Sequence, residues 1–229
     1  VMEQQVASRT PLIALLGNPN CGKTALFNRL TGSRQKVANY AGVTIERKEG
    51  TFTSPAGRAV RVLDLPGSYS LSATTPDEAI TRDVVAGMRD GERAPDAIVC
   101  VVSATNLRLN LRLVLEIKRL GLPMVLALNM VDVAKKRGIA IDAVRLEKEL
   151  GMPVVETVAV HAGGEKALLA ALDRMPHDVH VNANPLSAID AVSVEDTQRE
   201  VRRILAASAS YANDSGNLTE QIDHVVLHP

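Results

Sequence analysis

Short apolar runs, separated by polar and glycine-rich stretches, dominate the first three quarters of this chain. Each run is of strand length, which predicts buried β-strands. The runs are Leu12–Leu16, Ala59–Leu65, Ala97–Ser103, Met124–Asn129 and Pro153–Ala159. Thr44–Thr53 also has an extended pattern, and the turn residues 54–57 after it predict a hairpin with the second run. Gln35–Val43 carries few apolar residues, so we expect a loop there.

Between these runs, apolar residues recur at the spacing of helices that bury one face. The predicted helices are Thr24–Thr31, a helix beginning at Thr75, Leu107–Leu120, Ile141–Leu150 and Glu165–Met175. Thr75 can cap its helix, Pro76 suits the first helical position, and Glu78 completes a capping box. Because strands and helices alternate, the predicted fold class is α/β, with a mainly parallel sheet covered by helices on both faces.

The composition changes near Pro176. Residues 177–186 are polar and irregular, and Glu195–Ala212 has a helical pattern with Val201 and Ile204 on one face. We therefore expect two domains, an α/β domain over residues 1–176 and a small helical appendage over residues 177–229.

The bulk composition narrows the class of protein. Apolar residues make up 46% of the 229 residues and aromatic residues only 2%, so the core must be aliphatic. The formal charge is zero, with 26 basic and 26 acidic residues, and no basic stripe stands out, so we expect no nucleic acid as a partner. Cys21 and Cys100 are too few for a disulfide framework, and reduced thiols fit better. No signal peptide is visible, and no apolar run reaches the roughly 18 residues that span a bilayer, so we expect a soluble chain.

Residues 17–24 read Gly-Asn-Pro-Asn-Cys-Gly-Lys-Thr, a complete phosphate-binding loop between a predicted strand and a predicted helix. Its backbone N–H groups and the helix N-terminus favour a polyphosphate. Lys23 would reach the β- and γ-phosphates, and the Thr24 hydroxyl would ligate Mg²⁺. The predicted nucleotide-binding residues of this loop are Gly17, Asn18, Pro19, Asn20, Cys21, Gly22, Lys23, Thr24 and Ala25.

Two further positions suit the γ-phosphate end of a nucleotide. Asp64, in Asp64-Leu65-Pro66-Gly67, ends a predicted strand and can hold Mg²⁺ through water, while Gly67 can offer its N–H to the γ-phosphate. Thr44 follows the expected loop, and its hydroxyl is placed to close over Mg²⁺ and the γ-phosphate. The alternative is that Thr44 is an ordinary strand threonine.

Asn129-Met130-Val131-Asp132 ends a later strand. The Asp132 carboxylate can accept two N–H bonds from a guanine edge, which disfavours an ATPase, while Asn129 braces the neighbouring loops. Met130 stands where a lysine is usual and can pack on the base. A helix cap is the other interpretation of this spacing. Val158 and Ala159 end the last predicted strand, where a backbone N–H can contact the guanine oxygen.

Ser68 follows Gly67, where many small GTPases have a glutamine that orients the attacking water. A monovalent cation near the oxygen that bridges the β- and γ-phosphates can stabilise charge in place of such a residue. The Asn20 amide oxygen is placed to ligate K⁺. The alternative is that Asn20 only stabilises the loop. The candidate catalytic residues are Asn20, Lys23, Thr44 and Gly67; the candidate Mg²⁺ ligands are Thr24, Thr44 and Asp64.

Together with the phosphate loop, the segments Asn39–Gly50, Asp64–Leu71 and Asn129–Asp132 resemble the FeoB family of bacterial ferrous iron transporters, and the resemblance covers essentially the whole chain. It implies a P-loop GTPase fold with a six- to seven-stranded sheet over residues 1–176. It also implies a helical domain over residues 177–229 that stabilises the GDP-bound state and ends before the first membrane helix.

By the same resemblance, GTP binding and hydrolysis, with Mg²⁺ and with K⁺ at Asn20, would regulate Fe²⁺ uptake at the cytoplasmic face of the bacterial inner membrane. The expected partners are GTP and GDP and the transporter's own membrane domain, and a homo-oligomer is also compatible. Three residues depart from the family pattern: Cys21 and Val158 each replace a serine, and Ser103 replaces an aspartate. The change at Val158 is expected to speed GDP release.

A K⁺-dependent GTPase of ribosome assembly or RNA modification is the second interpretation. The neutral charge, the helical tail and Asn39–Gly50 speak against it. Neither His177 with His180 nor His224 with His228 is accompanied by further donors, so we expect no metal centre at these histidines.

Overall fold

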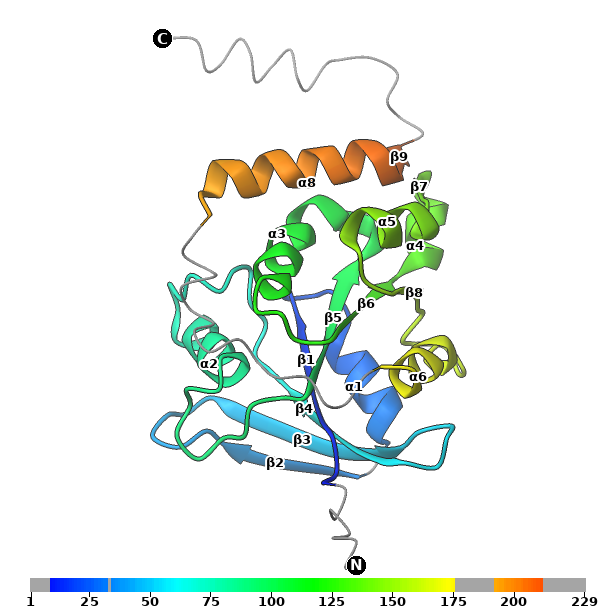
Figure 1. Cartoon of the computed structure of the whole chain (residues 1–229). Helices are drawn as coiled ribbons and strands as arrows, with labels where there is room; N and C mark the ends of the chain where they lie inside the picture. Colours follow the sequence, from blue (N-terminus) through cyan, green and yellow to red (C-terminus); the bar gives the residue numbers. More distant parts are fainter. Residues whose placement is uncertain (1–8, 33, 176–191, 212–229) are drawn as a thin grey trace, which may run out of the picture.

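The computed structural model describes residues 9–32, 34–175 and 192–211. Its main feature is a seven-stranded sheet with the order β2-β3-β4-β1-β5-β6-β8 (Figure 1). The strands are β1 (Leu12–Gly17), β2 (Gln35–Asn39), β3 (Glu46–Thr53), β4 (Ala59–Asp64), β5 (Ala97–Ser103), β6 (Met124–Asn129) and β8 (Val154–Glu156). Every pairing from β4 to β8 is parallel, and β3 runs antiparallel to β2 and β4. The expected mostly parallel α/β sheet is confirmed, with seven strands.

Helices cover both faces of this sheet (Figure 1). They are α1 (Lys23–Thr31), α2 (Pro76–Val85), α3 (Leu107–Lys118), α4 (Val131–Lys136), α5 (Ala143–Leu150) and α6 (Lys166–Asp173), with a short 3₁₀ helix at Ala104–Asn106. The apolar residues of α2, α3 and α5 pack on one face and those of α1 and α6 on the other, so the sheet separates two aliphatic cores. Thr75 caps α2 as predicted, since its side chain accepts a hydrogen bond from the Glu78 N–H.

The carboxyl ends of the parallel strands lie at one edge of the sheet because β4, β1, β5, β6 and β8 run in the same direction. Strands β1, β4, β5 and β6 end at Gly17, Asp64, Ser103 and Asn129. Ligands of open α/β sheets bind at this edge. The sheet therefore brings the predicted phosphate loop, Asp64 and Asn129 to the same side of the molecule.

Helix α8 (Val194–Ser208) lies outside the seven-stranded sheet and crosses over α3 and α5 (Figure 1). Val201 and Ile204 of α8 are buried in the core that contains α3 and α5. After α8, β9 (Ala209–Tyr211) pairs antiparallel with β7 (Ile139–Ile141) as a separate two-stranded sheet. The predicted domain boundary between residues 176 and 177 falls outside the described residues and stays a prediction.

The prediction of a loop over Gln35–Val43 is wrong for its first half, because residues 35–39 form β2 at the sheet edge. Four of these five residues are exposed. An edge strand that faces water on both sides has no apolar alternation to reveal it, and its order comes from backbone hydrogen bonds to β3.

Several predicted ends also change: β8 ends at Glu156 and not at Ala159, so Val158 and Ala159 follow the strand, α3 ends at Lys118 and not at Leu120, and α6 covers Lys166–Asp173 and not Glu165–Met175. The helix expected over Ile141–Leu150 begins at Ala143, where the Asp142 side chain caps it, and Ile141 belongs to β7. Helix α8 ends at Ser208 rather than Ala212, because the chain turns extended at Ala209 to pair with β7. Within the part of the chain that the structure describes, no helix is both long and apolar enough to cross a bilayer.

Candidate nucleotide-binding site

The phosphate loop connects β1 to α1 and depends on glycine at two positions. Gly22 has φ +88°, and a Cβ there would lie 2.2 Å from Nδ2 of Asn129. A Cβ on Gly17 would lie 2.4 Å from the carbonyl oxygen of Val101. A side chain at either position would force the neighbouring strand ends apart, so the glycines of the motif serve close packing as well as backbone freedom.

The predicted γ-phosphate residues meet beside this loop. Lys23 forms an ion pair with Asp64, and both side chains are largely buried, with 11% and 5% of their surface exposed. The Ser68 N–H donates to the carbonyl of Gly17 at 3.1 Å, which joins the segment after Asp64 to the phosphate loop. Thr24 is exposed at the start of α1. A cation and a carboxylate therefore meet beside the helix N-terminus, and Thr24 follows Lys23 in the first turn of α1.

Asn129 links the phosphate loop to the predicted base-binding loop. Its Nδ2 donates to the carbonyl of Cys21 at 3.0 Å, and its Oδ1 accepts from the Ala159 N–H at 3.0 Å and from the Thr157 hydroxyl at 3.3 Å. Only 2% of Asn129 is exposed. One buried amide thus fixes two loops that are more than a hundred residues apart, as the sequence predicted for a bracing residue.

The other predicted base contacts surround Asn129. Met130 takes a left-handed backbone conformation with φ 62°, and its Sδ accepts a hydrogen bond from the Ser103 hydroxyl at 3.5 Å. Asp132 is half-buried in the first turn of α4, while Val158 is half-buried and Ala159 is buried. Met130 and Asp132 thus lie at the start of α4, just after β6. Their contacts to a base stay predictions.

Thr44 and Asn20 are exposed, unlike Lys23, Asp64 and Asn129. Thr44 is exposed in the turn between β2 and β3, where the Tyr40 N–H donates to the Ile45 carbonyl at 3.0 Å. In the described part of the chain, no hydrogen bond joins Thr44 to Lys23 or Asp64. Asn20 is exposed on the phosphate loop with φ 63°. Thr44 therefore lies on the turn between β2 and β3, whereas Asn20 stands on the phosphate loop itself.

The remaining loop residues shape the backbone. Asn18 is buried, and its Nδ2 donates to the carbonyl of Leu109 on α3 at 3.4 Å. Pro19 is exposed, and Ala25 packs its half-buried methyl on the α1 side of the sheet. Burial raises the pKa of the Cys21 thiol, against the opposing effect of the Lys23 backbone N–H. A neutral, buried thiol at this position packs like a small apolar side chain.

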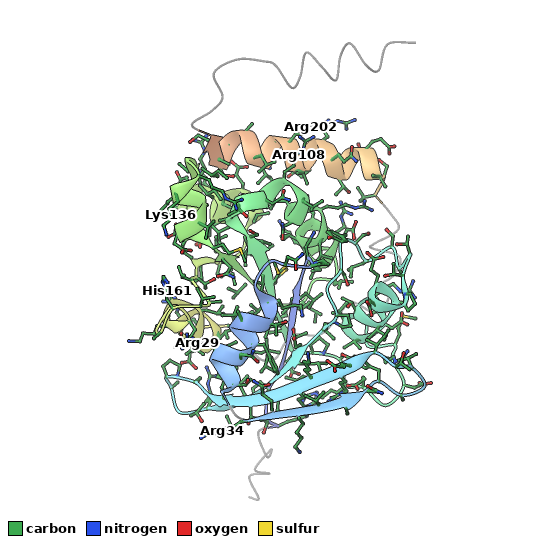
Figure 2. The ribbon with its side chains drawn as sticks, turned by 180° about the vertical axis from the view of Figure 1, so that it is seen from behind. Arg29, Arg34, Arg108, Lys136, His161 and Arg202 are labelled. Atoms are coloured by element: carbon green, nitrogen blue, oxygen red, sulfur yellow. The ribbon has the colours of Figure 1, made fainter. Side chains whose placement is uncertain are left out.

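Arg29 was missed by sequence reasoning. It lies on α1, and its Nη2 donates to the Val160 carbonyl at 3.0 Å while its Nε donates to the Ala159 carbonyl at 3.4 Å. Figure 2 shows Arg29 and His161 on the side of the molecule that carries α1 and α6. The Arg29 guanidinium therefore bonds α1 to the loop of residues 159–160, where the guanine contact is predicted. No local signal could have found it, because an arginine on an exposed helix face is common.

The described residues contain no cluster of metal ligands, and one hollow lies away from the nucleotide loops. Among the described residues, no group of three or more His, Cys, Asp or Glu side chains could hold a metal ion. The four histidines discussed above, at positions 177, 180, 224 and 228, lie outside the described residues. A hollow of about 620 Å³ lies between the amino ends of β6 and β8 and the ends of α3 and α6, at the edge opposite the nucleotide loops.

Comparison with known proteins decides the family. The sequence model of the family described as ferrous iron transport protein B matches residues 11–172 of this chain. The chain belongs to the FeoB family. The Fe(2+) transporter FeoB of Escherichia coli K12 is 45% identical over 163 residues, which cover 71% of this chain and 21% of that protein. The chain thus spans about a fifth of the length of this FeoB relative.

Solved FeoB structures agree with the fold. The cytosolic domain of L. pneumophila FeoB is 31% identical with a TM-score of 0.74, and the match covers 87% of this chain and 99% of that one. The cytosolic domain of T. maritima FeoB in a GDP form is 28% identical with a TM-score of 0.73, covering 88% of this chain and 99% of that one. The P-loop GTPase fold expected from the sequence is confirmed.

Proposed function

We propose that this chain binds GTP and hydrolyses it to GDP and phosphate, and that this cycle regulates Fe²⁺ uptake by a membrane part of the same transporter. The observation that carries the proposal is the meeting of Lys23, Asp64 and Asn129 around the phosphate loop at the carboxyl edge of the sheet. The GDP form of the similar T. maritima domain supports nucleotide binding at such a fold.

The phosphate end of the site fits a magnesium nucleotide. The Asp64 carboxylate pairs with Lys23, and the Thr24 hydroxyl is on the next residue; both are hard oxygen donors, the ligands that Mg²⁺ prefers. When bound, Mg²⁺ neutralises charge on the phosphate oxygens. In the proposed cycle, Lys23 leaves Asp64 to contact the phosphates, Gly67 offers its N–H to the γ-phosphate, and Thr44 moves in from the hairpin turn.

The base end of the site favours guanine. Asn129 holds the Ala159 and Cys21 backbones in place, and Asp132 stands in the first turn of α4 beside them. In the proposed complex, the Asp132 carboxylate accepts the two N–H groups of the guanine edge, and the Ala159 region contacts the guanine oxygen. Met130 packs on the base without the positive charge of the usual lysine.

Asn20 is the proposed K⁺ ligand. Asn20 is exposed on the phosphate loop, and its backbone is left-handed with φ 63°. Because Ser68 is too short to orient water as a glutamine does, a cation at Asn20 would supply the charge stabilisation that hydrolysis needs.

Family membership supports a proposal for the chain's place in the cell. The matched relatives are Fe²⁺ transporters, and this chain corresponds to about 21% of the E. coli protein. We propose the cytoplasmic face of the bacterial inner membrane, with the transporter's membrane domain as partner. Family membership and the neutral charge disfavour the ribosome-assembly alternative.

GTP turnover in potassium chloride and sodium chloride at equal ionic strength tests the proposal. The wild-type chain should turn over GTP faster in potassium, and Asn20→Ala should remove this preference while keeping GDP binding. Lys23→Ala should abolish turnover in both salts, by at least about a hundredfold, because it removes charge from the developing phosphate.

Two outcomes would count against parts of this scheme. Equal slow turnover in both salts would refute the K⁺ mechanism while leaving a GTP-binding switch. Preference for ATP over GTP would refute the assignment of the base site.

A further inference from the structure

Glu116 is a buried carboxylate that the nucleotide site does not use. It lies on α3, and only 7% of its side chain is exposed. A charged group in such a place is costly unless it is paired and hydrogen-bonded. Its partners therefore show what the residue holds in place.

The donors that face Glu116 come mainly from the segment after Gly67. The Leu71 N–H donates to Oε2 at 2.6 Å, and the Ser70 hydroxyl lies 2.9 Å from the same oxygen. Arg112, one turn earlier on α3, donates to Oε1 at 2.9 Å and also to the Ser70 hydroxyl at 3.2 Å. Both side-chain oxygens of Glu116 therefore face hydrogen-bond donors.

The segment that Glu116 holds is the one that must respond to the γ-phosphate. Gly67 stands three positions before Ser70, and its Cβ position lies 3.2 Å from the Pro19 side chain in the phosphate loop. Leu71 is buried in the core with α3. Between these two points, Tyr69 is exposed, with 47% of its surface accessible. The chain is therefore anchored at Leu71 by Glu116 and the core, and closer to Gly67 by the Ser68 N–H on the Gly17 carbonyl at 3.1 Å and the Tyr69 N–H on Glu78 Oε1 at 3.3 Å.

Helix α3 is itself fixed from the far side. Arg119, just after α3, donates to the Thr197 hydroxyl of α8 at 2.9 Å, and Arg112 lines a hollow between α3 and α8 that Arg108 and Arg202 also border. Figure 2 shows Arg108 and Arg202 at neighbouring places on these two helices. Glu116 thus projects from a helix that packs in the core and is bonded to α8 at its end.

We propose that Glu116 is a positioning residue for GTP hydrolysis. By fixing Ser70 and Leu71, it sets the hinge from which Gly67 approaches the γ-phosphate. The proposal rests on the proposed GTPase function, and it assigns Glu116 no contact with the nucleotide.

The test compares Glu116→Ala and Glu116→Gln with Asp96→Ala. Asp96 is a matched control, because it also accepts a backbone N–H, from Leu12 at 2.7 Å, and pairs with an arginine, Arg93, but at the opposite edge of the sheet. Both Glu116 variants should lower kcat for GTP at least about tenfold, since a small misplacement of a reacting group is costly. KM and GDP affinity should change less than about twofold. Glu116→Gln keeps the volume of the side chain in case Glu116→Ala folds poorly.

Hydrogen exchange at the Leu71 amide gives an independent readout. Protection in the wild-type chain should persist with both GDP and a non-hydrolysable GTP analogue, and both Glu116 variants should lose it, while Asp96→Ala should keep both protection and kcat. Unchanged kcat in the Glu116 variants, or loss of GDP affinity in step with kcat, would overturn the proposal. A wild-type chain without turnover would refute the proposed function instead, and unchanged Leu71 protection in the variants would then still refute the anchor.

Discussion

Asn129 shows how much one buried side chain can organise. Its amide uses both a donor and an acceptor atom, toward Cys21 on one loop and toward Thr157 and Ala159 on another. Because it is buried, each lost partner would leave an unsatisfied polar group, at a cost of about 1–3 kcal/mol. The geometry of the base site thus depends on a residue that need not touch the base.

The residue next to this network, Val158, carries a testable consequence. Valine cannot form the local hydroxyl-to-backbone hydrogen bonds that serine forms in loops. We expect Val158→Ser to stiffen the base loop and slow GDP dissociation about two- to tenfold, as one added hydrogen bond would. Displacement of a fluorescent GDP analogue, followed by stopped flow, measures the rate.

Val160→Ser is the control, since Val160 is 70% exposed on the same loop. It should leave the dissociation rate unchanged. An equal slowing in both variants would mean that the effect comes from loop polarity and not from the position of Val158.

At the scale of elements, β3 is fastened to its surroundings by charges rather than by apolar packing alone. Glu49 pairs with Arg61 of β4 at 2.7 Å and with Arg47 of its own strand at 2.7 Å, and Arg47 reaches Glu92 before β5. The hydrogen bond from Arg61 is the main cause that lowers the pKa of Glu49, and Arg47 adds to it against the effect of burial. The hairpin that carries Thr44 therefore rests on an ionised Glu49.

This network predicts a pH-dependent stability difference. Because the folded state lowers the pKa of Glu49 below its ordinary value of 4.5, its stabilisation is present above that value and is lost as the pH falls through the lowered pKa. Glu49→Gln should lower the free energy of unfolding by about 1 kcal/mol near pH 7, a modest loss because solvent partly screens the ion pairs. Urea unfolding at pH 7 and in acid measures this, and the difference from wild type should shrink in acid.

Glu46→Gln is the matched control for this prediction. Glu46 begins the same strand and pairs with Lys48, but its side chain is 62% exposed. Glu46→Gln should lower the free energy of unfolding by less than about 0.5 kcal/mol at any pH. A Glu49 variant that behaves the same way would contradict a stabilising role for the network.

At the scale of the whole molecule, α8 packs on the outside of α3 and α5 and adds its apolar residues to the core on that face of the sheet. Ile204 is completely buried between α8 and the layer of α3 and α5, and β9 closes the end by pairing with β7. These contacts predict that α8 unfolds together with the nucleotide-binding part.

Ile204→Ala tests this cooperation. Deleting a buried isoleucine side chain should cost about 2–5 kcal/mol, whereas Arg199→Ala on the exposed face should cost less than about 0.5 kcal/mol. Urea unfolding at fixed nucleotide concentration, followed by circular dichroism and by release of a fluorescent GDP analogue, should show one transition shifted equally by both probes. A nucleotide-release midpoint unaffected by Ile204→Ala would mean that α8 unfolds on its own.

The regular helices and strands of the protein could be predicted from the amino-acid pattern. Buried strands and amphipathic helices leave a local period, and their alternation specifies a parallel sheet whose strands end at one edge. The phosphate loop and Asp64 could be placed at that edge from spacing alone, because strand ends dictate where such residues lie. The apolar pattern in this way predicted the sheet and the side of it that carries the site.

Features that leave no periodic pattern in the sequence depend on contacts between distant parts of the folded chain. Residues 35–39 form strand β2 because they pair with β3. The same pairing places Thr44 in the turn that connects the two strands. Arg29 reaches Val160 and Glu116 reaches Leu71 across 131 and 45 positions of sequence. Such contacts join residues whose neighbours along the chain give no sign of them, so only the folded arrangement shows which polar side chains hold the loops of the site.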